Sequence, residues 1–278
     1  MATELEYKKT RGRPRTTGLD QPAAPVQALD RALVLLRELA RTDSANLTEL
    51  AQRTNVAPST THRLLTTMQA HGVAEFDETS QNWMIGVEAF RIGSSFVRRT
   101  RIVEAGRTIM RTLMETSGET ANMAIVDGGD VVFISQVETH QPIRAFFRPG
   151  ERGPIHASGI GKALLAEYTD EAVKRIADGN GLPAFTDKTL SGPEDLIRDL
   201  EEVRRRGWSL DDEERNLGMR CIAAAIYNEH GEAVAGVSVS GPTVRIPDER
   251  IDELGPQVKQ AAAEITRSIG GVPPSGRT

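Results

Sequence analysis

One segment that leads from a loop into a predicted helix contains residue types that could bind a ligand. Its sequence is His156-Ala157-Ser158-Gly159-Ile160-Gly161-Lys162-Ala163, and its small side chains leave backbone N–H groups uncovered. Such a helix start suits an anion, above all a carboxylate. It is not a P-loop, because alanine follows the Gly-Lys pair and His156 replaces the first glycine. The alternative is that the glycines only allow close helix–sheet packing.

Two serines and one thiol are expected near this segment. Ser238 and Ser240 alternate along a predicted strand, so both hydroxyls face one side, where buried polar groups need partners. Cys221 opens the preceding strand, although a lone thiol is more often a small buried hydrophobe. The acidic run Asp211-Asp212-Glu213-Glu214 is typical of a solvated loop. We interpret the set as a binding pocket for a small molecule.

An enzyme is the competing interpretation. Cys221 and His156 could form a nucleophile–base pair in a cysteine-dependent hydrolase that acts on a small carboxylate or amide. Neither residue lies in a recognisable catalytic motif, and the five histidines lack metal-ligand spacing. We therefore expect no catalytic residues, no metal and no cofactor.

Length, composition and charge limit the class of protein. At 278 residues with 38% hydrophobic and 26% charged side chains, two globular domains are expected. No apolar run approaches the roughly 18 residues of a membrane span, and the N-terminus lacks the apolar core of a signal peptide. One cysteine excludes an intramolecular disulfide framework and favours a cytoplasmic protein. Residues 1–100 contain 13 basic and 11 acidic residues, and residues 101–278 contain 21 basic and 28 acidic residues. A slightly basic N-terminal part before an acidic remainder suits an N-terminal nucleic-acid-binding module.

The stretch LTELAQRTNVAPSTTHRLLTTM, Leu47–Met68, predicts two short helices joined by a tight turn. A small residue at Ala51 lets the helices cross closely, and Asn55 tolerates the left-handed backbone that the turn needs. Val56 fills the corner, and Pro58 suits the first turn of the second helix. At this point, a helix-turn-helix and an ordinary helical hairpin are equally good interpretations.

The second helix of this stretch has one apolar stripe and one polar face. The stripe has i, i+3, i+4, i+7 spacing and consists of Thr61, Leu64, Leu65 and Met68. A face of short hydroxyls and one arginine could read bases in the major groove of double-stranded DNA. The candidate DNA-binding residues in and before this helix are Thr48, Ser59, Thr60, Thr61, Arg63 and Thr67.

The flanking segments favour DNA binding. Residues 26–40 predict a preceding helix, and Thr48 is a candidate cap of the next one. Residues 73–86 alternate as a β-hairpin, which makes residues 26–86 a winged helix-turn-helix. Residues 1–25 predict a disordered basic tail whose Arg-Gly-Arg-Pro core resembles an AT-hook. Its candidate minor-groove residues are Arg11, Arg13 and Arg15, and the alternative is a solvated basic tail that at most contacts phosphates. A further alternative for the whole protein is a constitutive nucleoid-type binder driven by this tail.

The rest of the chain predicts a connecting helix and a second domain. Residues 87–101 form an apolar helix, interpreted as a dimerisation element, with packing between domains as the alternative. Residues 102–270 predict an α+β domain with a mainly antiparallel sheet. Its strands are expected at 121–126, 131–137, 143–147, 222–227 and 233–240, and its helices at 102–117, 160–167, 170–178, 193–206 and 247–269. Residues 271–278 are expected to be a loose tail.

Over residues 26–270 the chain resembles the IclR family of transcriptional regulators. The matching segments are ALDRALVLLRELA, LTELAQRTNVAPSTTHRLLTTM, HASGIGKALLA, RRRGWSLDDEERNLGMRCIAAAIY and VSVSGP. The resemblance implies a winged helix-turn-helix, a linker helix and a GAF-like effector-binding domain. It also implies a homodimer or dimer of dimers that represses or activates transcription from a DNA operator. The closest similarity is to glyoxylate-responsive members, among them the regulator of the β-hydroxyaspartate pathway.

The resemblance also implies where an effector binds. In relatives that sense small 2-oxo acids such as glyoxylate, the ligand is held by the helix start, the cysteine and the paired serines. The corresponding and bordering positions in this chain are Ser158, Gly159, Ile160, Asp212, Met219, Cys221, Ser238 and Ser240. Phe146-Phe147 is expected to narrow the pocket with an aromatic wall.

Overall fold

The computed structural model describes residues 26–274, without the side chains of residues 97–100. The basic tail with Arg11, Arg13 and Arg15 and the last four residues lie outside the described residues. The chain divides into two compact units, Met1–Gly93 and Ser94–Thr278. Among the described helices, none has the length and apolar character needed to cross a membrane.

The first unit is a three-helix bundle followed by a β-hairpin. Its elements are α1 (Gln27–Thr42), α2 (Leu47–Thr54), α3 (Pro58–Ala70), β1 (Ala74–Asp77) and β2 (Asn82–Ile85). The two strands are antiparallel, with Ala74 opposite Ile85. Leu35 and Leu39 of α1, Leu50 of α2 and Leu65 of α3 are fully buried against Trp83 of the hairpin. The predicted winged helix-turn-helix order is therefore present.

The turn between α2 and α3 follows from its residues. Asn55 has φ 52° and ψ 39°, in the left-handed region that asparagine tolerates. Pro58 occupies the first turn of α3, and Val56 is buried between the helices. The predicted cap at Thr48 is wrong. Asn46 caps α2, because its side chain accepts a hydrogen bond from the Glu49 N–H at 3.0 Å while Glu49 accepts one from the Asn46 N–H.

The second unit is built on a six-stranded antiparallel sheet with the strand order β5-β4-β3-β8-β7-β6. The strands are β3 (Thr120–Asp127), β4 (Asp130–Val137), β5 (Arg152–Pro154), β6 (Ser209–Asp212), β7 (Met219–Tyr227) and β8 (Ala233–Pro242). Helix α4 (Val87–Thr100) spans the division between the two units, and α5 (Ile102–Ser117) follows it within the second unit. The remaining helices are α6 (Gly159–Leu165), α7 (Asp170–Asn180), α8 (Pro193–Arg206) and α9 (Asp248–Ser268).

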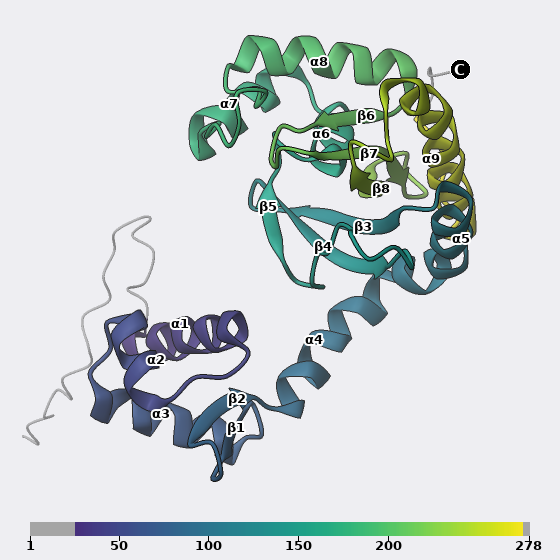
Figure 1. The fold of residues 1–278 in the computed structure, drawn as a ribbon. Helices are drawn as coiled ribbons and strands as arrows, with labels where there is room; N and C mark the ends of the chain where they lie inside the picture. The colour runs from purple at the N-terminus through teal and green to yellow at the C-terminus, as the bar shows by residue number, and fades with distance from the viewer. Residues whose placement is uncertain (1–25, 275–278) are drawn as a thin grey trace, which may run out of the picture. The chain divides into compact units, whose positions relative to one another are not determined.

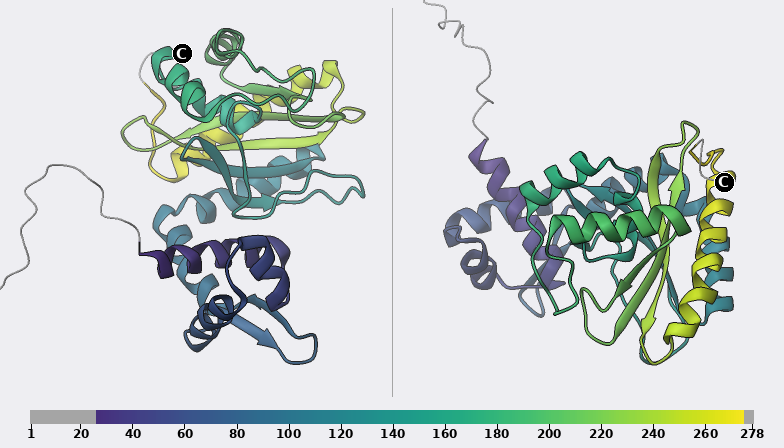
Figure 2. Two further views of the ribbon diagram at one scale, coloured as in Figure 1. Left: turned by 90° about the vertical axis from the view of Figure 1, so that its left-hand side faces the viewer. Right: turned by 90° about the horizontal axis from the view of Figure 1, so that it is seen from above.

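Helices cover both faces of this sheet (Figure 1). On one face α5 and α9 pack over a core that includes Met110, Ile222, Val237 and Ile265. On the other face α6, α7 and α8 enclose a second core. Figure 2 shows the sheet between α8 on one side and α9 on the other. The α+β class and the mainly antiparallel sheet are confirmed.

Two sequence predictions are wrong in the second unit. Residues 143–147 form no strand; the strand at this edge of the sheet is β5, which pairs with β4 through Val131 and Gly153. The acidic run is not simply a solvated loop, because Asp211 and Asp212 belong to β6 and pair with Cys221 and Arg220 of β7. Both errors concern short edge strands, whose side chains show too little alternation to be recognised.

Candidate functional site

The polar face of α3 is the first candidate surface. Ser59, Arg63 and Thr67 are exposed along it, Thr60 is half-buried, and Thr48 is exposed on α2. Thr61 is a correction to the predicted set. It is fully buried, and its hydroxyl donates to the Val56 carbonyl at 3.3 Å, so it supports the turn and is out of reach of DNA.

Two exposed residues of α3 escaped the sequence prediction. His62 and Thr66 lie one helical turn apart, close to Ser59 and Arg63 on the same outer surface. The signal was available, since both positions fall outside the stripe that ends at Met68. An imidazole and a hydroxyl add hydrogen-bonding groups to the surface that α3 presents.

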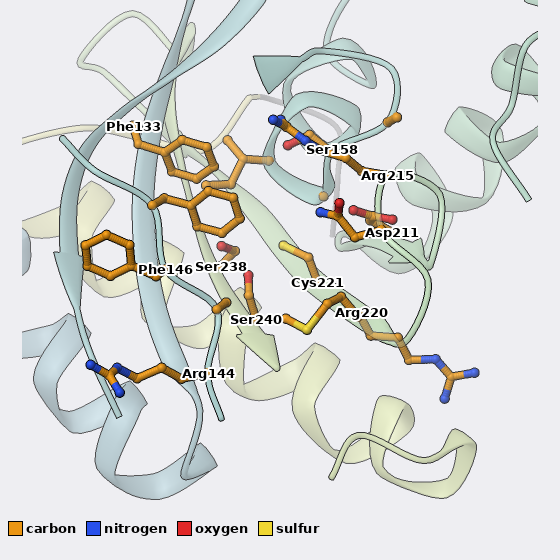
Figure 3. A pocket seen from close by; sticks show the side chains of 17 residues that line it. Phe133, Arg144, Phe146, Ser158, Asp211, Arg215, Arg220, Cys221, Ser238 and Ser240 are labelled. Atoms are coloured by element: carbon orange, nitrogen blue, oxygen red, sulfur yellow. The ribbon is translucent and has the colours of Figure 1, made fainter. Parts of the chain in front are cut away.

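The second candidate site is a cavity of about 230 Å³ in the second unit (Figure 3). It brings together residues from the start of α6, from β6, β7 and β8, and from the irregular segment before β5. All predicted effector-binding residues except Asp212 line it, namely Ser158, Gly159, Ile160, Met219, Cys221, Ser238 and Ser240. Segments far apart in the sequence thus converge on one pocket.

The start of α6 is fixed against β7 by close contact. The Ser158 hydroxyl accepts a hydrogen bond from the Gly161 N–H at 3.3 Å and so caps the helix. A Cβ on Gly159 would lie 2.7 Å from the Cys221 Sγ, so only glycine permits this approach. The Ser209 hydroxyl of β6 donates to the Gly159 carbonyl at 2.6 Å. The glycine therefore serves packing, and that packing places the Cys221 thiol at the helix start.

The paired serines differ in their hydrogen bonding. Ser240 accepts a hydrogen bond from the Asn122 side-chain amide at 3.2 Å. Ser238 is 1% exposed, and its hydroxyl makes no hydrogen bond to an oxygen or nitrogen of the described residues; the Cys221 thiol is its polar neighbour. A buried hydroxyl without a partner costs free energy unless a ligand or water satisfies it. Figure 3 shows both hydroxyls beside the Cys221 thiol.

Asp211, and not the predicted Asp212, lines the pocket. Asp211 lies opposite Cys221 in the β6–β7 pairing, so its side chain shares the face of the sheet on which the Cys221 thiol lies. The Asp212 carboxylate instead forms ion pairs with Arg220 at 2.6 Å and Lys188 at 3.3 Å. Burial raises the pKa of Asp211 to about 6, while the Glu214 N–H and the nearby Lys162 and Arg215 act in the opposite direction. The pocket thus contains a carboxylate that titrates near neutral pH.

Glu214, the last residue of the acidic run, connects the pocket wall to α6 through an ion pair. Lys162 of α6 is fully buried, and its ammonium lies 2.9 Å from an Asp199 oxygen of α8 and also pairs with Glu214. Burial alone would lower the pKa of Lys162, but the two carboxylates outweigh it and raise the pKa. Burial raises the pKa of Glu214 to about 7 against the attraction of Lys162.

Cys221 and His156 do not form the nucleophile–base pair of the hydrolase interpretation. The His156 Nε2 lies 3.1 Å from the Pro183 carbonyl, and His156 is not among the residues that line the cavity. Burial raises the pKa of the Cys221 thiol to about 11, so it is uncharged at neutral pH and a poor nucleophile. Within residues 26–274, no group of three or more His, Cys, Asp or Glu side chains is placed to hold a metal ion.

Aromatic rings form one wall of the pocket, and arginines are also among its lining residues. Phe133 and Phe147 stack with their centroids 4.2 Å apart, and Phe146 also lines the cavity, as the sequence suggested. Sequence reasoning missed Phe133 and the lining arginines Arg144, Arg215 and Arg220. Arg144 and Arg215 lie in irregular segments, whose path no hydrophobic periodicity predicts.

Comparisons with known proteins identify the family of this chain. The family model described as IclR helix-turn-helix domain matches residues 28–78, and that described as bacterial transcriptional regulator IclR C-terminal matches residues 94–267. The HTH-type transcriptional regulator BhcR of Paracoccus denitrificans is 51% identical over 261 residues, which is 93% of this chain and 94% of that protein.

A second relative and a solved structure give the same result. The transcriptional repressor IclR of Escherichia coli is 44% identical over 265 residues, covering 94% of this chain and 97% of the repressor. The crystal structure of the Thermotoga maritima IclR superposes with a TM-score of 0.74 at 27% identity, covering 88% of this chain and all of the other.

Proposed function

Because this chain belongs to the IclR family of bacterial transcriptional regulators and is a DNA-binding regulator, we propose that a small carboxylate in the pocket of the second unit controls its binding to an operator. The observation that carries the proposal is the Ser238 hydroxyl, which is buried, lines the cavity and makes no hydrogen bond to an oxygen or nitrogen of the described residues. The hydrolase alternative has no support, since its thiol is uncharged and the similar proteins are named as regulators.

The lining favours a compact acid with a second polar oxygen, such as glyoxylate or another 2-oxo acid. The hydroxyls of Ser238 and Ser240 and the thiol of Cys221 can donate hydrogen bonds to it. Arg215 adds positive charge at the opposite wall. The resemblance to glyoxylate-responsive regulators supports the same ligand class. No cofactor is needed for this role.

The regulator acts as a homodimer or a dimer of dimers in this proposal. A symmetric dimer places two α3 helices on half-sites about one helical turn of DNA, roughly 34 Å, apart. A ligand can change operator affinity only if its own affinity differs between the DNA-binding state and the state that does not bind DNA. Such coupling is typically about 1–3 kcal/mol, or about 5- to 150-fold in affinity. Repression and activation are both compatible with this mechanism.

The test removes the pocket hydroxyls and leaves the DNA-binding unit unchanged. In a gel-shift titration with the operator, Ser238→Ala/Ser240→Ala is expected to bind DNA like the wild type but to lose its response to glyoxylate. The control is Ser191→Ala, which changes an exposed serine outside the cavity. A normal ligand response in the double variant would show that the effector binds elsewhere.

A further inference from the structure

A second cavity lies in the effector-binding unit, where the end of α8, strand β7 and helix α9 meet (Figure 1). Its volume is about 440 Å³, within the range of small-molecule pockets, and it shares no residue with the effector pocket. Its lining is unusually rich in alanine, from α6, β7 and α9. These residues are Ala163, Ala224, Ala225, Ala262 and Ala263. Their small side chains leave the space empty.

The cavity also exists because β6 is shorter than β7. The pairing of β6 with β7 ends at Ser209 and Ala223, whereas β7 continues to Tyr227. Past that point β7 is paired only with β8 among the described strands. One edge of the sheet therefore opens into the cavity, and the half-buried Ala225 lies on it.

An aromatic ring forms a fixed wall of the cavity. Trp208 is 8% exposed and lines it. On one side a Cβ at Gly255 of α9 would come within 2.3 Å of the indole, so the helix backbone touches the ring. The Arg206 guanidinium carbon lies 3.9 Å from the ring centroid. These contacts cover the faces of the ring and hold it in place, so the indole presents an apolar edge to the cavity.

The rim carries positive charge that no carboxylate of the described residues neutralises. Arg204 and Arg205 line the cavity but pair with Asp170 and Glu202. Lys259 donates to the Arg206 carbonyl at 3.2 Å, and within the described residues neither it nor Arg267 has a carboxylate at ion-pair distance. The acidic lining residue, Glu167, already accepts a hydrogen bond from the Tyr227 hydroxyl at 3.0 Å.

We propose that this cavity is a second ligand site, for a monocarboxylate with an apolar body. The alanine floor and the Trp208 ring take the aliphatic or aromatic part, and Lys259 and Arg267 take the carboxylate. Because α9 also packs against α5, which directly follows α4, a ligand wedged beside α9 is well placed to act on the junction with the linker helix. This second site is separate from the effector pocket, and ligand binding there does not require a ligand in the effector pocket.

Tryptophan fluorescence tests the site directly. The chain has two tryptophans, so Trp83→Phe leaves Trp208 as the sole reporter. Titration of this full-length variant with sodium octanoate is expected to give a saturable change in Trp208 emission. Octanamide, which has the same apolar body without the charge, should bind at least tenfold more weakly.

Variants in the same background separate this site from the effector pocket. Ala263→Phe fills the cavity and should abolish the signal, and Lys259→Glu/Arg267→Glu, at two exposed positions that should not disturb folding, should also abolish it. Ser238→Ala/Ser240→Ala should leave it unchanged. The proposal is overturned if octanoate gives no saturable change, if the charge reversal has no effect, or if only the serine variant loses the response.

Discussion

At the scale of single residues, the effector pocket depends on a carboxylate that lies close to where an anion is proposed to bind. Asp211 lines the cavity, and burial raises its pKa to about 6. Above that pH the side chain is ionised and repels a ligand carboxylate; below it the side chain is neutral and can donate a hydrogen bond. The pocket should therefore bind small acids more tightly as the pH falls.

We expect the affinity for glyoxylate to rise about tenfold between pH 7.5 and pH 5, because one unit charge is removed at close range. Asp211→Asn should bind at pH 7.5 as the wild type does at pH 5 and should lose most of this pH dependence. Isothermal titration calorimetry at both pH values measures the effect. The matched control is Asp195→Asn on α8, whose exposed carboxylate pairs with Arg198 and does not line the cavity; an equal flattening there would contradict the assignment to Asp211.

Neighbouring residues of α3 allow a second prediction at this scale. Arg63 is exposed, whereas Thr61 is buried and bonded to Val56. Arg63→Ala should weaken operator binding by about 1–3 kcal/mol if the guanidinium contacts a base. Thr61→Val should leave operator affinity nearly unchanged but lower the free energy of unfolding by about 1 kcal/mol. Gel-shift titrations paired with urea unfolding separate these effects, and a larger loss of affinity in Thr61→Val would reverse the two roles.

Most of the pocket residues could be predicted because they lie on regular elements. Ser238 and Ser240 alternate on β8, and Ser158 to Ile160 begin a helix, so their faces follow from backbone periodicity. The choice between Asp211 and Asp212 needed the register of β6, which the sequence does not reveal. Arg144 and Arg215 lie on irregular segments and could not be predicted at all.

At the scale of elements, Lys162 links three parts of the effector-binding unit. It belongs to α6, Asp199 belongs to α8, and Glu214 follows β6 next to the pocket. The Glu214 carbonyl also accepts a hydrogen bond from Thr189, and its N–H donates to Asp211 at 2.8 Å. One buried ammonium thus holds the pocket wall against the helical layer.

Lys162→Met should lower the free energy of unfolding by about 3–5 kcal/mol, because it leaves buried carboxylates without their counterion. Without Lys162 the pKa of Glu214 must rise further, so the native state retains a proton that the unfolded state releases above its ordinary pKa. The loss of stability should therefore be smaller at pH 6 than at pH 8. Urea unfolding at both pH values measures this. Lys162→Met/Glu214→Leu should recover part of the stability, and no recovery would indicate that the lysine serves mainly to fill space.

The elements of this fold were predictable where they are long. Amphipathic helices such as α5 and α8 and the hairpin of β3 and β4 repeat their periodicity enough times to be read from the sequence. The short β5 and β6 were missed, and residues 143–147 were taken for a strand, because a few apolar residues in a row fit a strand and a pocket wall equally well.

At the scale of the whole molecule, the first unit exposes apolar side chains on two of its helices. Val26, Leu29 and Leu33 lie at or on α1, and Val87 and Phe90 lie on α4. The side chain of Phe90 is 75% exposed. Large exposed apolar side chains on more than one helix favour association, and a regulator that binds paired half-sites has a use for it. We infer that these residues contribute to a homodimer.

Phe90→Asp should weaken or abolish this dimer, since it places a charge where an apolar contact is expected. Light scattering should show a lower molecular mass, and operator affinity should fall at least tenfold because each protomer then binds its half-site alone. Calorimetry should still show glyoxylate binding, since the effector pocket lies wholly in the second unit. Val244→Asp, an exposed apolar residue of that unit, is the control and should change neither mass nor affinity. If Phe90→Asp keeps the wild-type mass, the association surface lies elsewhere; if it loses DNA binding at an unchanged mass, Phe90 acts within the DNA-binding unit itself.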